Sequence, residues 1–343
     1  MKIVRRISLS FELAILLFAL TLPTAADACG CGIFLPKEGT VGITQERAII
    51  RWDGQTEDIV MALQVQGDAT EAAWIMPVPS PAQVKLGDPR MLDFLQDYTK
   101  PREETVYEIL PMIGALGEGA SGSAVTLLDR REIGLYDVST LAANDAQALT
   151  DWLNTNGYKF PSNASQIFQT YVEQKWYYIA ARVSPNKASS VKGELDPLWL
   201  TFKSDRVIYP MRPSALARGP MGVFLYILSD HRMNVAGLRT EFAGWIAPSD
   251  LTVASDHPIR QVVNRKYFLT KLQRMVFSPA SEITDDYVAS PVSDQEYRAV
   301  TYKYVDTVAG IPILSLLCVG LLGLVVAIPS TVLLGVIRRK RKK

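Results

Sequence analysis

Two cysteines near the start of the chain carry the first chemistry that the sequence offers. Cys29 and Cys31 are separated only by Gly30, and the third cysteine, Cys318, lies far along the chain. Glycine tolerates the tight backbone of a small ring, so the pair can close as a strained and easily reduced disulfide. The pair can equally join two chains, carry a lipid on Cys29, or have no chemical role. Cys29 and Cys31 are therefore the disulfide or redox candidates.

The sequence contains only two histidines, His231 and His257, so a zinc site built from three histidines is excluded. Each histidine follows an aspartate, Asp230 or Asp256, and such a carboxylate can orient an imidazole as in a nucleophilic triad. The nucleophile motif Gly-x-Ser-x-Gly does not accompany them, and we interpret both as solvated loop residues. A hydrolase is accordingly the third choice of function.

A glycine motif and two acid pairs partly match cofactor or metal sites, but the residues around them do not fit such sites. The spacing Gly117-x-Gly119-x-x-Gly122 matches a dinucleotide-binding turn, but residues 123–138 have the pattern of a strand where that turn requires a helix. Two pairs of acids, Glu103-Glu104 and Asp285-Asp286, lack the alternating oxygen ligands of a calcium loop. We predict a surface loop, solvated acids, no cofactor and no metal.

A proline-rich strip follows a tryptophan: Trp74, Pro77, Pro79 and Pro81. Proline has no amide hydrogen for a ladder, so the strip is predicted to end a sheet. A preformed extended segment also loses little entropy when it binds, which makes the same four residues a candidate docking surface for a partner.

The elements that must position these residues are mostly strands. Residues 47–52, 58–65 and 71–76 alternate with turn residues and predict a β-meander. The segment Leu198–Lys203 alternates apolar and polar side chains as a one-sided sheet requires. Further strands are predicted at Tyr177–Val183, Val207–Tyr209 and Val223–Leu228.

Apolar residues at helical spacing predict four short helices. Their ranges are Asp88–Tyr98, a helix capped by Asn144 or Asp145 and stopped by Asn156-Gly157, a helix capped by Ser162 or Asn163, and Tyr267–Val276. The short segments Trp74-Ile-Met-Pro77 and Trp245-Ile-Ala-Pro248 are similar in sequence, which leaves open that the domain consists of two related halves that arose by duplication. The sequence thus predicts an α+β fold, β-rich with a few helices.

Both ends of the chain have the composition of targeting segments. Residues 1–28 combine a basic start, an apolar run and a small-x-small cleavage site, which predicts a signal peptide. Residues 310–337 carry no charge and are long enough to form a transmembrane helix, and the basic tail 338–343 marks the cytoplasmic side. Residues 29–308 are then an extracytoplasmic domain on a single-pass cell-membrane protein.

The charge of that domain argues against one class of partner. The whole chain has 36 basic and 35 acidic residues. Without the three basic and two acidic residues of the leader and the six cations of the tail, 27 basic and 33 acidic residues remain. An acidic excess disfavours nucleic acid, so the expected partners are the cytoplasmic membrane and an unknown envelope protein or ligand.

Three segments together resemble a known prokaryotic family. They are the CGCG run at Cys29, the segment Ala48–Ala82 with W-D-G-x-x-E and A-W-I-x-P-V-P-S, and the segment Tyr267–Asp286. The chain resembles the prokaryotic family of domain of unknown function 2330, and the resemblance covers most of the extracytoplasmic part. It implies export and, in many members, a C-terminal membrane helix, but no established activity and no catalytic residue.

Three classes of function remain open. We favour a non-enzymatic, membrane-anchored binding or envelope-associated protein, because a large β-rich domain is predicted without catalytic motifs. A thiol-redox protein that uses Cys29 and Cys31 is the second class, and a hydrolase that uses His231 or His257 is the third.

Overall fold

The computed structural model describes residues 32–109, 136–142, 146–158, 164–183, 192–217, 219–308 and 311–312. The chain divides into two compact units, residues 1–99 with 132–297 and residues 100–131 with 298–343. Strands greatly outnumber helices in the described residues, so the predicted β-rich α+β fold is confirmed.

The larger sheet of the first unit has nine strands. They are β2 (Val41–Trp52), β3 (Thr56–Gly67), β5 (Gln83–Leu86), β9 (Gly193–Glu194), β10 (Leu198–Lys203), β12 (Met221–Ser229), β14 (Arg239–Ile246), β15 (Tyr267–Val276) and β17 (Tyr297–Arg298). Their order is β17-β14-β15-β12-β2-β3-β10-β5, with β9 paired to β3. β2 and β12 run parallel, whereas β2 pairs with β3 as an antiparallel hairpin.

The turn of this hairpin has the local chemistry that the sequence predicts. Asp53 Oδ1 accepts hydrogen bonds from the backbone N–H groups of Gln55 and Thr56, at 3.0 and 2.8 Å. Gly54 has φ +95°, a conformation that side chains with a Cβ rarely adopt. The turn at Asp53-Gly54 therefore fixes the register of the two longest strands.

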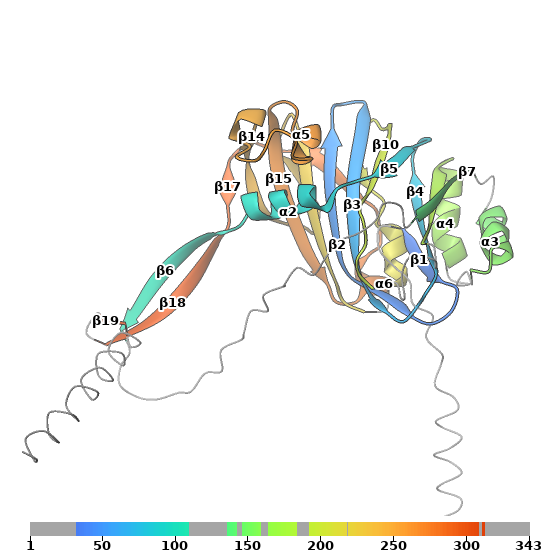
Figure 1. The fold of residues 1–343 in the computed structure, drawn as a ribbon, viewed down its shortest axis with the longest axis horizontal. Helices are drawn as coiled ribbons and strands as arrows, with labels where there is room; N and C mark the ends of the chain where they lie inside the picture. The colour runs from blue at the N-terminus through green and yellow to red at the C-terminus, as the bar shows by residue number, and fades with distance from the viewer. Residues whose placement is uncertain are drawn as a thin grey trace, which may run out of the picture. The chain divides into compact units, whose positions relative to one another are not determined.

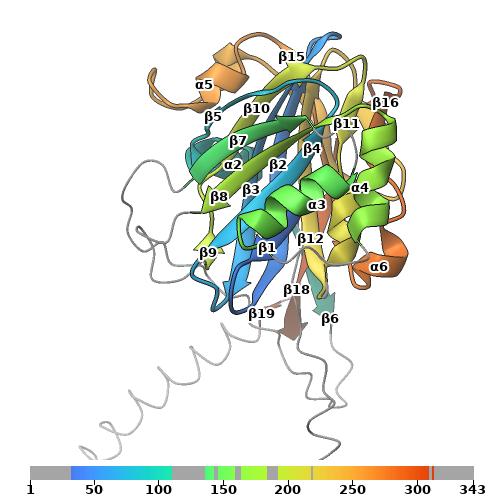
Figure 2. The same ribbon diagram turned by 90° about the vertical axis from the view of Figure 1, so that its right-hand side faces the viewer.

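A smaller antiparallel sheet packs on the larger one (Figure 2). Its strands, in spatial order, are β1 (Ile33–Pro36), β4 (Ala72–Val78), β8 (Tyr177–Val183) and β7 (Tyr136–Ala142). Helices α3 (Ala146–Thr155) and α4 (Ala164–Glu173) cover its outer face, where the Tyr178 hydroxyl donates to the Phe168 carbonyl of α4 at 3.0 Å. Trp74 and Met76 point by alternation to the inner face and are fully buried in the core between the sheets.

Two further helices cover the outer face of the larger sheet, where α2 crosses in front of the strands (Figure 1). They are α2 (Pro89–Tyr98) and α5 (Ile259–Val262). Met91, Leu92 and Leu95 of α2 pack into a second apolar cluster with residues of β12 and β15. Asp88 caps α2 by accepting from the Arg90 N–H, which confirms the predicted helix.

The first unit is completed by short elements: strands β11 (Val207–Tyr209), β13 (Met233–Val235) and β16 (Tyr287–Pro291), 3-10 turns η2 (Arg212–Leu216) and η3 (Pro248–Asp250), and helix α6 (Pro279–Glu282). β16 lies between β11 and β13 in a three-stranded sheet. The second unit pairs β6 (Arg102–Ile109) in parallel with β18 (Val300–Val308), which also pairs with β19 (Ile311–Pro312).

The predicted helix at Tyr267–Val276 is wrong, because this segment is strand β15. Phe268 and Leu272 face one side of the sheet while Tyr267 and Leu269 face the other, and all four are buried. A strand buried on both faces has a nearly continuous apolar sequence, which here matched helical spacing by coincidence.

Two strand predictions also need correction, and a third is confirmed in its described part. The predicted meander ends after two strands, because β4 leaves the larger sheet and pairs with β1 and β8. β10 is not one-sided, since Leu198, Trp199 and Leu200 are all buried. Of residues 123–138, those from 136 onward belong to β7, and the earlier ones lie outside the described residues.

The other helix and strand predictions are confirmed, with α3 ending before Asn156-Gly157 and α4 following Pro161. The predicted caps of these two helices lie outside the described residues. The two similar segments occupy different sheets, Trp74 in β4 and Trp245 in β14, and their duplication stays a prediction.

The predicted membrane segments fall almost wholly outside the described residues. Within the part of the chain that the structure describes, no helix has the length and apolar character needed to cross a bilayer. Only Ile311 and Pro312 of the segment 310–337 are described, and they form β19.

Candidate functional site

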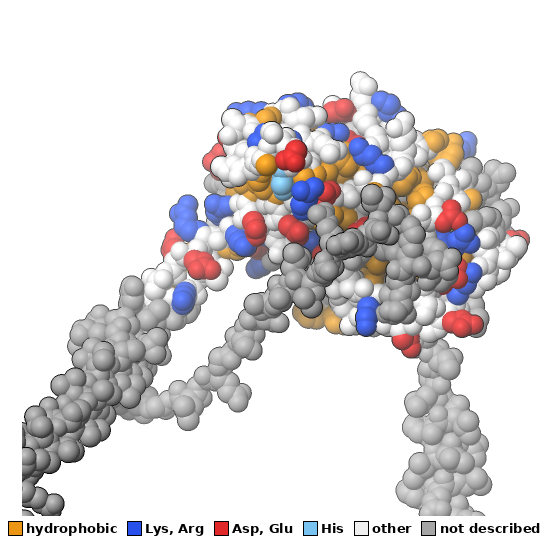
Figure 3. Space-filling model, in the orientation of Figure 1, with side chains coloured by type: hydrophobic (Ala, Val, Ile, Leu, Met, Phe, Trp, Pro, Cys, Tyr) orange, Lys and Arg blue, Asp and Glu red, His pale blue; other side chains and the backbone are white. Residues whose placement is uncertain are grey.

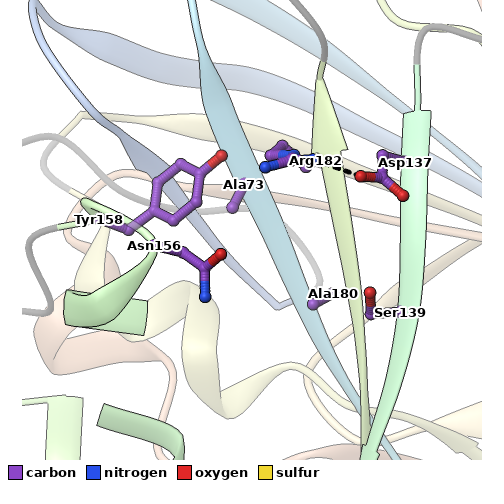
Figure 4. Close-up of a pocket in the computed structure, with 7 residues that line it drawn as sticks. All are labelled: Ala73, Asp137, Ser139, Asn156, Tyr158, Ala180 and Arg182. Carbon is purple, nitrogen blue, oxygen red and sulfur yellow. Dashed lines mark hydrogen bonds and ion pairs between the residues drawn. The ribbon is translucent and has the colours of Figure 1, made fainter. Parts of the chain in front are cut away.

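A polar recess lies on the outer face of the smaller sheet (Figure 4). Its volume is about 100 Å³, which suits a terminal chemical group rather than a whole metabolite. Seven residues line it: Ala73, Asp137, Ser139, Asn156, Tyr158, Ala180 and Arg182.

The floor of the recess follows from strand register. Arg182 of β8 lies opposite Ala73 of β4 on one side and Asp137 of β7 on the other. On the same face of the sheet, two residues before Arg182 in β8, Ala180 lies opposite Ser139. Because alanine side chains are short, Ala73 and Ala180 leave a hollow between the longer polar side chains.

The wall of the recess comes from the turn that ends α3. Gly157 has φ +84°, and the Tyr158 N–H donates to the Leu153 carbonyl at 2.9 Å, which closes the helix end. This glycine stop turns the chain so that Asn156 and Tyr158 both face the sheet (Figure 4). Local helix-stop chemistry therefore positions two of the five polar lining residues.

The charges of the recess are paired within it. Arg182 Nη2 forms an ion pair with Asp137 Oδ2, and both side chains keep a large exposed fraction, 41% and 60%. The hydrogen bond to Asp137 raises the pKa of Arg182. An exposed pair of this kind contributes little to stability, so its groups remain available to a ligand.

Tyr158 is held from behind by a second ion pair. Its hydroxyl donates to Glu71 Oε1 at 3.1 Å, and the same oxygen lies 2.6 Å from Lys37 Nζ. Burial raises the pKa of Tyr158, and the Glu71 carboxylate raises it further. The ring is thus a fixed, neutral wall.

This arrangement is suited to binding. Arg182 supplies donors, Asp137 supplies acceptors, and the Ser139 hydroxyl can do either. Since the two charges already compensate each other, the recess favours an uncharged group that both donates and accepts hydrogen bonds. Neither histidine is among the described residues that line the recess, so neither is placed to activate Ser139 as a nucleophile.

The side-chain contacts of the two histidines are with residues other than their neighbouring aspartates. His231 Nδ1 lies 3.0 Å from Asp294 Oδ2, and this contact raises the pKa of the exposed imidazole. Asp230 instead pairs with Arg265 at 2.6 Å. His257 Nδ1 accepts from the Ile259 N–H at 3.3 Å.

Ser229, the serine next to His231 in sequence, is not placed to act as its nucleophile. The nearby Ser229 hydroxyl donates to the His231 carbonyl at 2.6 Å and not to the imidazole. The geometry at His231 therefore gives no support to the hydrolase hypothesis.

The proline strip is more buried than a docking surface would be. Trp74 and Pro77 are buried in β4, Pro79 is half-buried, and Pro81 is exposed. Pro77 pairs with Tyr178 in the ladder between β4 and β8, and the described register with β1 ends two residues earlier, at Ile75. The predicted end of the sheet comes after Val78, and partner docking stays a prediction.

The other residues predicted as site candidates lie in different places or outside the described residues. Cys29 and Cys31 and the glycine-rich motif lie outside the described residues. Glu103 and Glu104 are exposed on β6. Asp285 pairs with Arg212, and Asp286 accepts from the Tyr171 hydroxyl at 2.6 Å, which ties α4 to η2. Across the described residues, no cluster of three or more His, Cys, Asp or Glu side chains could hold a metal.

Both motifs of the segment Ala48–Ala82, one of the three that carry the family resemblance, contact residues 203–208, where β10 leads into β11. From the first motif, Trp52 Nε1 donates to the Ser204 carbonyl at 3.2 Å and the buried Glu57 carboxylate accepts from the Ile208 N–H. From the second, Ser80 Oγ accepts from the Lys203 N–H and donates to its carbonyl, both at 2.9 Å. Both motifs therefore serve to fasten this connection to the sheets.

Comparison with known proteins gives one family. The family model described as an uncharacterized protein conserved in bacteria, DUF2330, matches residues 25–289. A search of curated proteins finds no match. Among solved structures, the crystal structure of baculovirus P35 is similar at 10% identity and a TM-score of 0.36, over 78% of this chain and 99% of that chain. That TM-score is too low to support an argument.

Proposed function

We propose, since the chain belongs to the bacterial family of domain of unknown function 2330, that it is a membrane-anchored extracytoplasmic binding protein. Its ligand site is the recess between α3 and the smaller sheet. The observation that carries the binding role is the exposed Arg182–Asp137 pair beside the hollow above Ala73 and Ala180.

The anchoring is supported by the sequence of the two ends. Residues 1–28 have the composition of a cleaved leader, and the uncharged residues 310–337 are followed by six cations. A leader followed by one membrane helix leaves residues 29–308 outside the cytoplasm. The recess would then meet molecules of the cell envelope.

The ligand class follows from the balance of charges. An uncharged terminal group with a hydrogen-bond donor and an acceptor can bridge Arg182 and Asp137 while their opposite charges stay balanced. A sugar diol and a carboxamide both supply this chemistry. The small volume requires that the rest of the ligand remains outside the recess.

Saturation-transfer NMR on the full-length protein in detergent would test the binding role with cellobiose and N-acetylalanine amide as probes. We expect one of the two to bind, which also separates the sugar from the amide. Arg182→Gln should weaken that binding at least tenfold, because a charged donor is lost. Arg206→Gln is the matched control, since Arg206 also forms an exposed ion pair, with Asp205. Binding of neither probe, or equal binding by both variants, would refute the proposal.

The anchoring has a separate test. A protease added outside the cytoplasmic membrane should digest the domain and spare a fragment that carries an epitope placed after Lys343. An epitope that is itself digested from outside would overturn the proposed topology and leave the binding result standing.

A further inference from the structure

Two hydrogen-bond donors lie side by side on the outer face of the larger sheet, far along the chain from the recess. Lys271 of β15 is opposite Tyr226 of β12 in the ladder, and its Nζ lies 5.8 Å from the centroid of the Tyr226 ring. Only 7% of Lys271 and 1% of Tyr226 is exposed. Both residues share the face that α2 crosses (Figure 1).

Neither donor has a hydrogen-bond partner among the described residues. Glu241, whose charge opposes the effect of burial on the pKa of Lys271, is already engaged by Arg239 at 2.7 Å and by Gln273 at 2.9 Å. Burial lowers the pKa of Lys271, and burial raises the pKa of Tyr226. The Lys271 ammonium lies over the Tyr226 ring as a cation–π contact, which leaves its N–H donors free for an acceptor from outside.

An apolar surface borders the two donors. A Cβ built on Gly222 would lie 2.9 Å from the Phe224 ring and 3.4 Å from the Met275 sulfur, so both side chains gather over this glycine. Met275 is 52% exposed although it is a large apolar residue. Phe242, opposite Lys271 on β14, closes the other side.

Acids also face this surface, but from α2. Asp93 of α2 is neutralised by Arg47, which lies 3.1 Å away on β2. The charges of Asp93 and Asp97 raise the pKa of Tyr226, and the charge of Glu241 raises the pKa of Lys271. Among the described residues Lys271 forms no ion pair, whereas Arg47 on the same face is paired with Asp93.

We propose that Lys271 and Tyr226 bind the carboxylate of an amphipathic ligand whose apolar part lies on Phe224 and Met275. The ammonium supplies the counter-charge and the phenol a second donor, and a carboxylate has two oxygens to receive them. The exposed thioether and ring provide the apolar contact. This site is independent of the recess and of its proposed ligand.

The test uses the full-length protein with 4-phenylbutyrate as the probe, measured by calorimetry. We expect 4-phenylbutyrate to bind and 4-phenylbutanol, which has the same apolar body without the carboxylate, to bind at least tenfold more weakly. Lys271→Met should weaken binding of the acid about tenfold to a hundredfold, and Tyr226→Phe about threefold to tenfold. Lys266→Met is the matched control, because Lys266 is an exposed lysine close to the start of the same strand.

A second measurement does not depend on any variant. In the wild-type protein, 4-phenylbutyrate should slow acetylation of Lys271 by acetic anhydride, as mass spectrometry detects, and leave Lys266 unchanged. Equal binding of the acid and the alcohol, equal affinity of Lys271→Met and wild type, or an unprotected Lys271 would each overturn the proposal. Absence of any binding of the acid to the wild type would do the same.

Discussion

Replacing Glu57 with glutamine should stabilise the protein at neutral pH. The Glu57 side chain is completely buried beside Asp58, and its carboxylate accepts from the Ile208 N–H at 3.2 and 3.3 Å. Burial raises the pKa of Glu57 well above its usual value. Glutamine has the same shape, can accept the same hydrogen bond and carries no charge, so it resembles the protonated form that the fold prefers.

The sign and size of the effect follow from proton linkage. The folded state keeps its proton on Glu57 above pH 4.5, where the unfolded chain has released it, so wild-type stability falls as pH rises above 4.5 towards the raised pKa. One proton sets a limit of about 1.4 kcal/mol for each pH unit in that window. The Glu57→Gln variant should therefore match the wild type near pH 4 and gain stability progressively as the pH rises from about 5 towards the raised pKa of Glu57.

Urea unfolding of the full-length protein in detergent, followed by tryptophan fluorescence at pH 4, 5, 6 and 7, would measure this difference. Glu57→Ala is the control, because it also removes the charge but leaves the Ile208 N–H without its acceptor, so it should be about 1–3 kcal/mol less stable than Glu57→Gln at every pH. A difference between Glu57→Gln and wild type that does not change with pH would refute the reasoning.

Three further outcomes are expected. Gly157→Ala should cost about 1 kcal/mol in urea unfolding, because φ +84° is strained for alanine, and no loss would contradict the role of the glycine stop. Trp199→Phe removes the 2.8 Å hydrogen bond from the indole N–H to the buried Asp58 carboxylate and should cost about 2 kcal/mol in the same assay, whereas a cost below about 0.5 kcal/mol would show that the bond is dispensable. Mass spectrometry of protein isolated under alkylating conditions should find Cys29 and Cys31 oxidised, within one chain or between two, and free thiols at both positions would reject this.

Turns and helix ends that depend only on neighbouring residues could be predicted from the sequence. The Asp53-Gly54 turn and the Asn156-Gly157 helix stop each depend on a glycine with positive φ and on hydrogen bonds within a few residues. Such chemistry is visible in a short stretch of sequence. The helix Asp88–Tyr98 was predictable for the same reason, because its cap and its apolar stripe are local.

Contacts between residues that lie far apart in the sequence could not be predicted from it. The recess exists because β7 and β8 bring Asp137 and Arg182 together, and no local pattern marks either residue. The partner of His231 is Asp294 and not its neighbour Asp230, because the three-stranded sheet places the later segment beside it. The only local signal for the recess was the helix stop, which positions Asn156 and Tyr158.

The parallel pairing of β2 with β12 has a consequence for how this protein folds. The strand that begins at Val41 is flanked by its hairpin partner β3 at once, but its other neighbour becomes available only after Ser229 has been synthesised. Closing so long a loop is entropically costly and slows the search for the native state. The centre of the larger sheet therefore forms late, and until then the apolar faces of β2 and β3 are open to other unfolded chains.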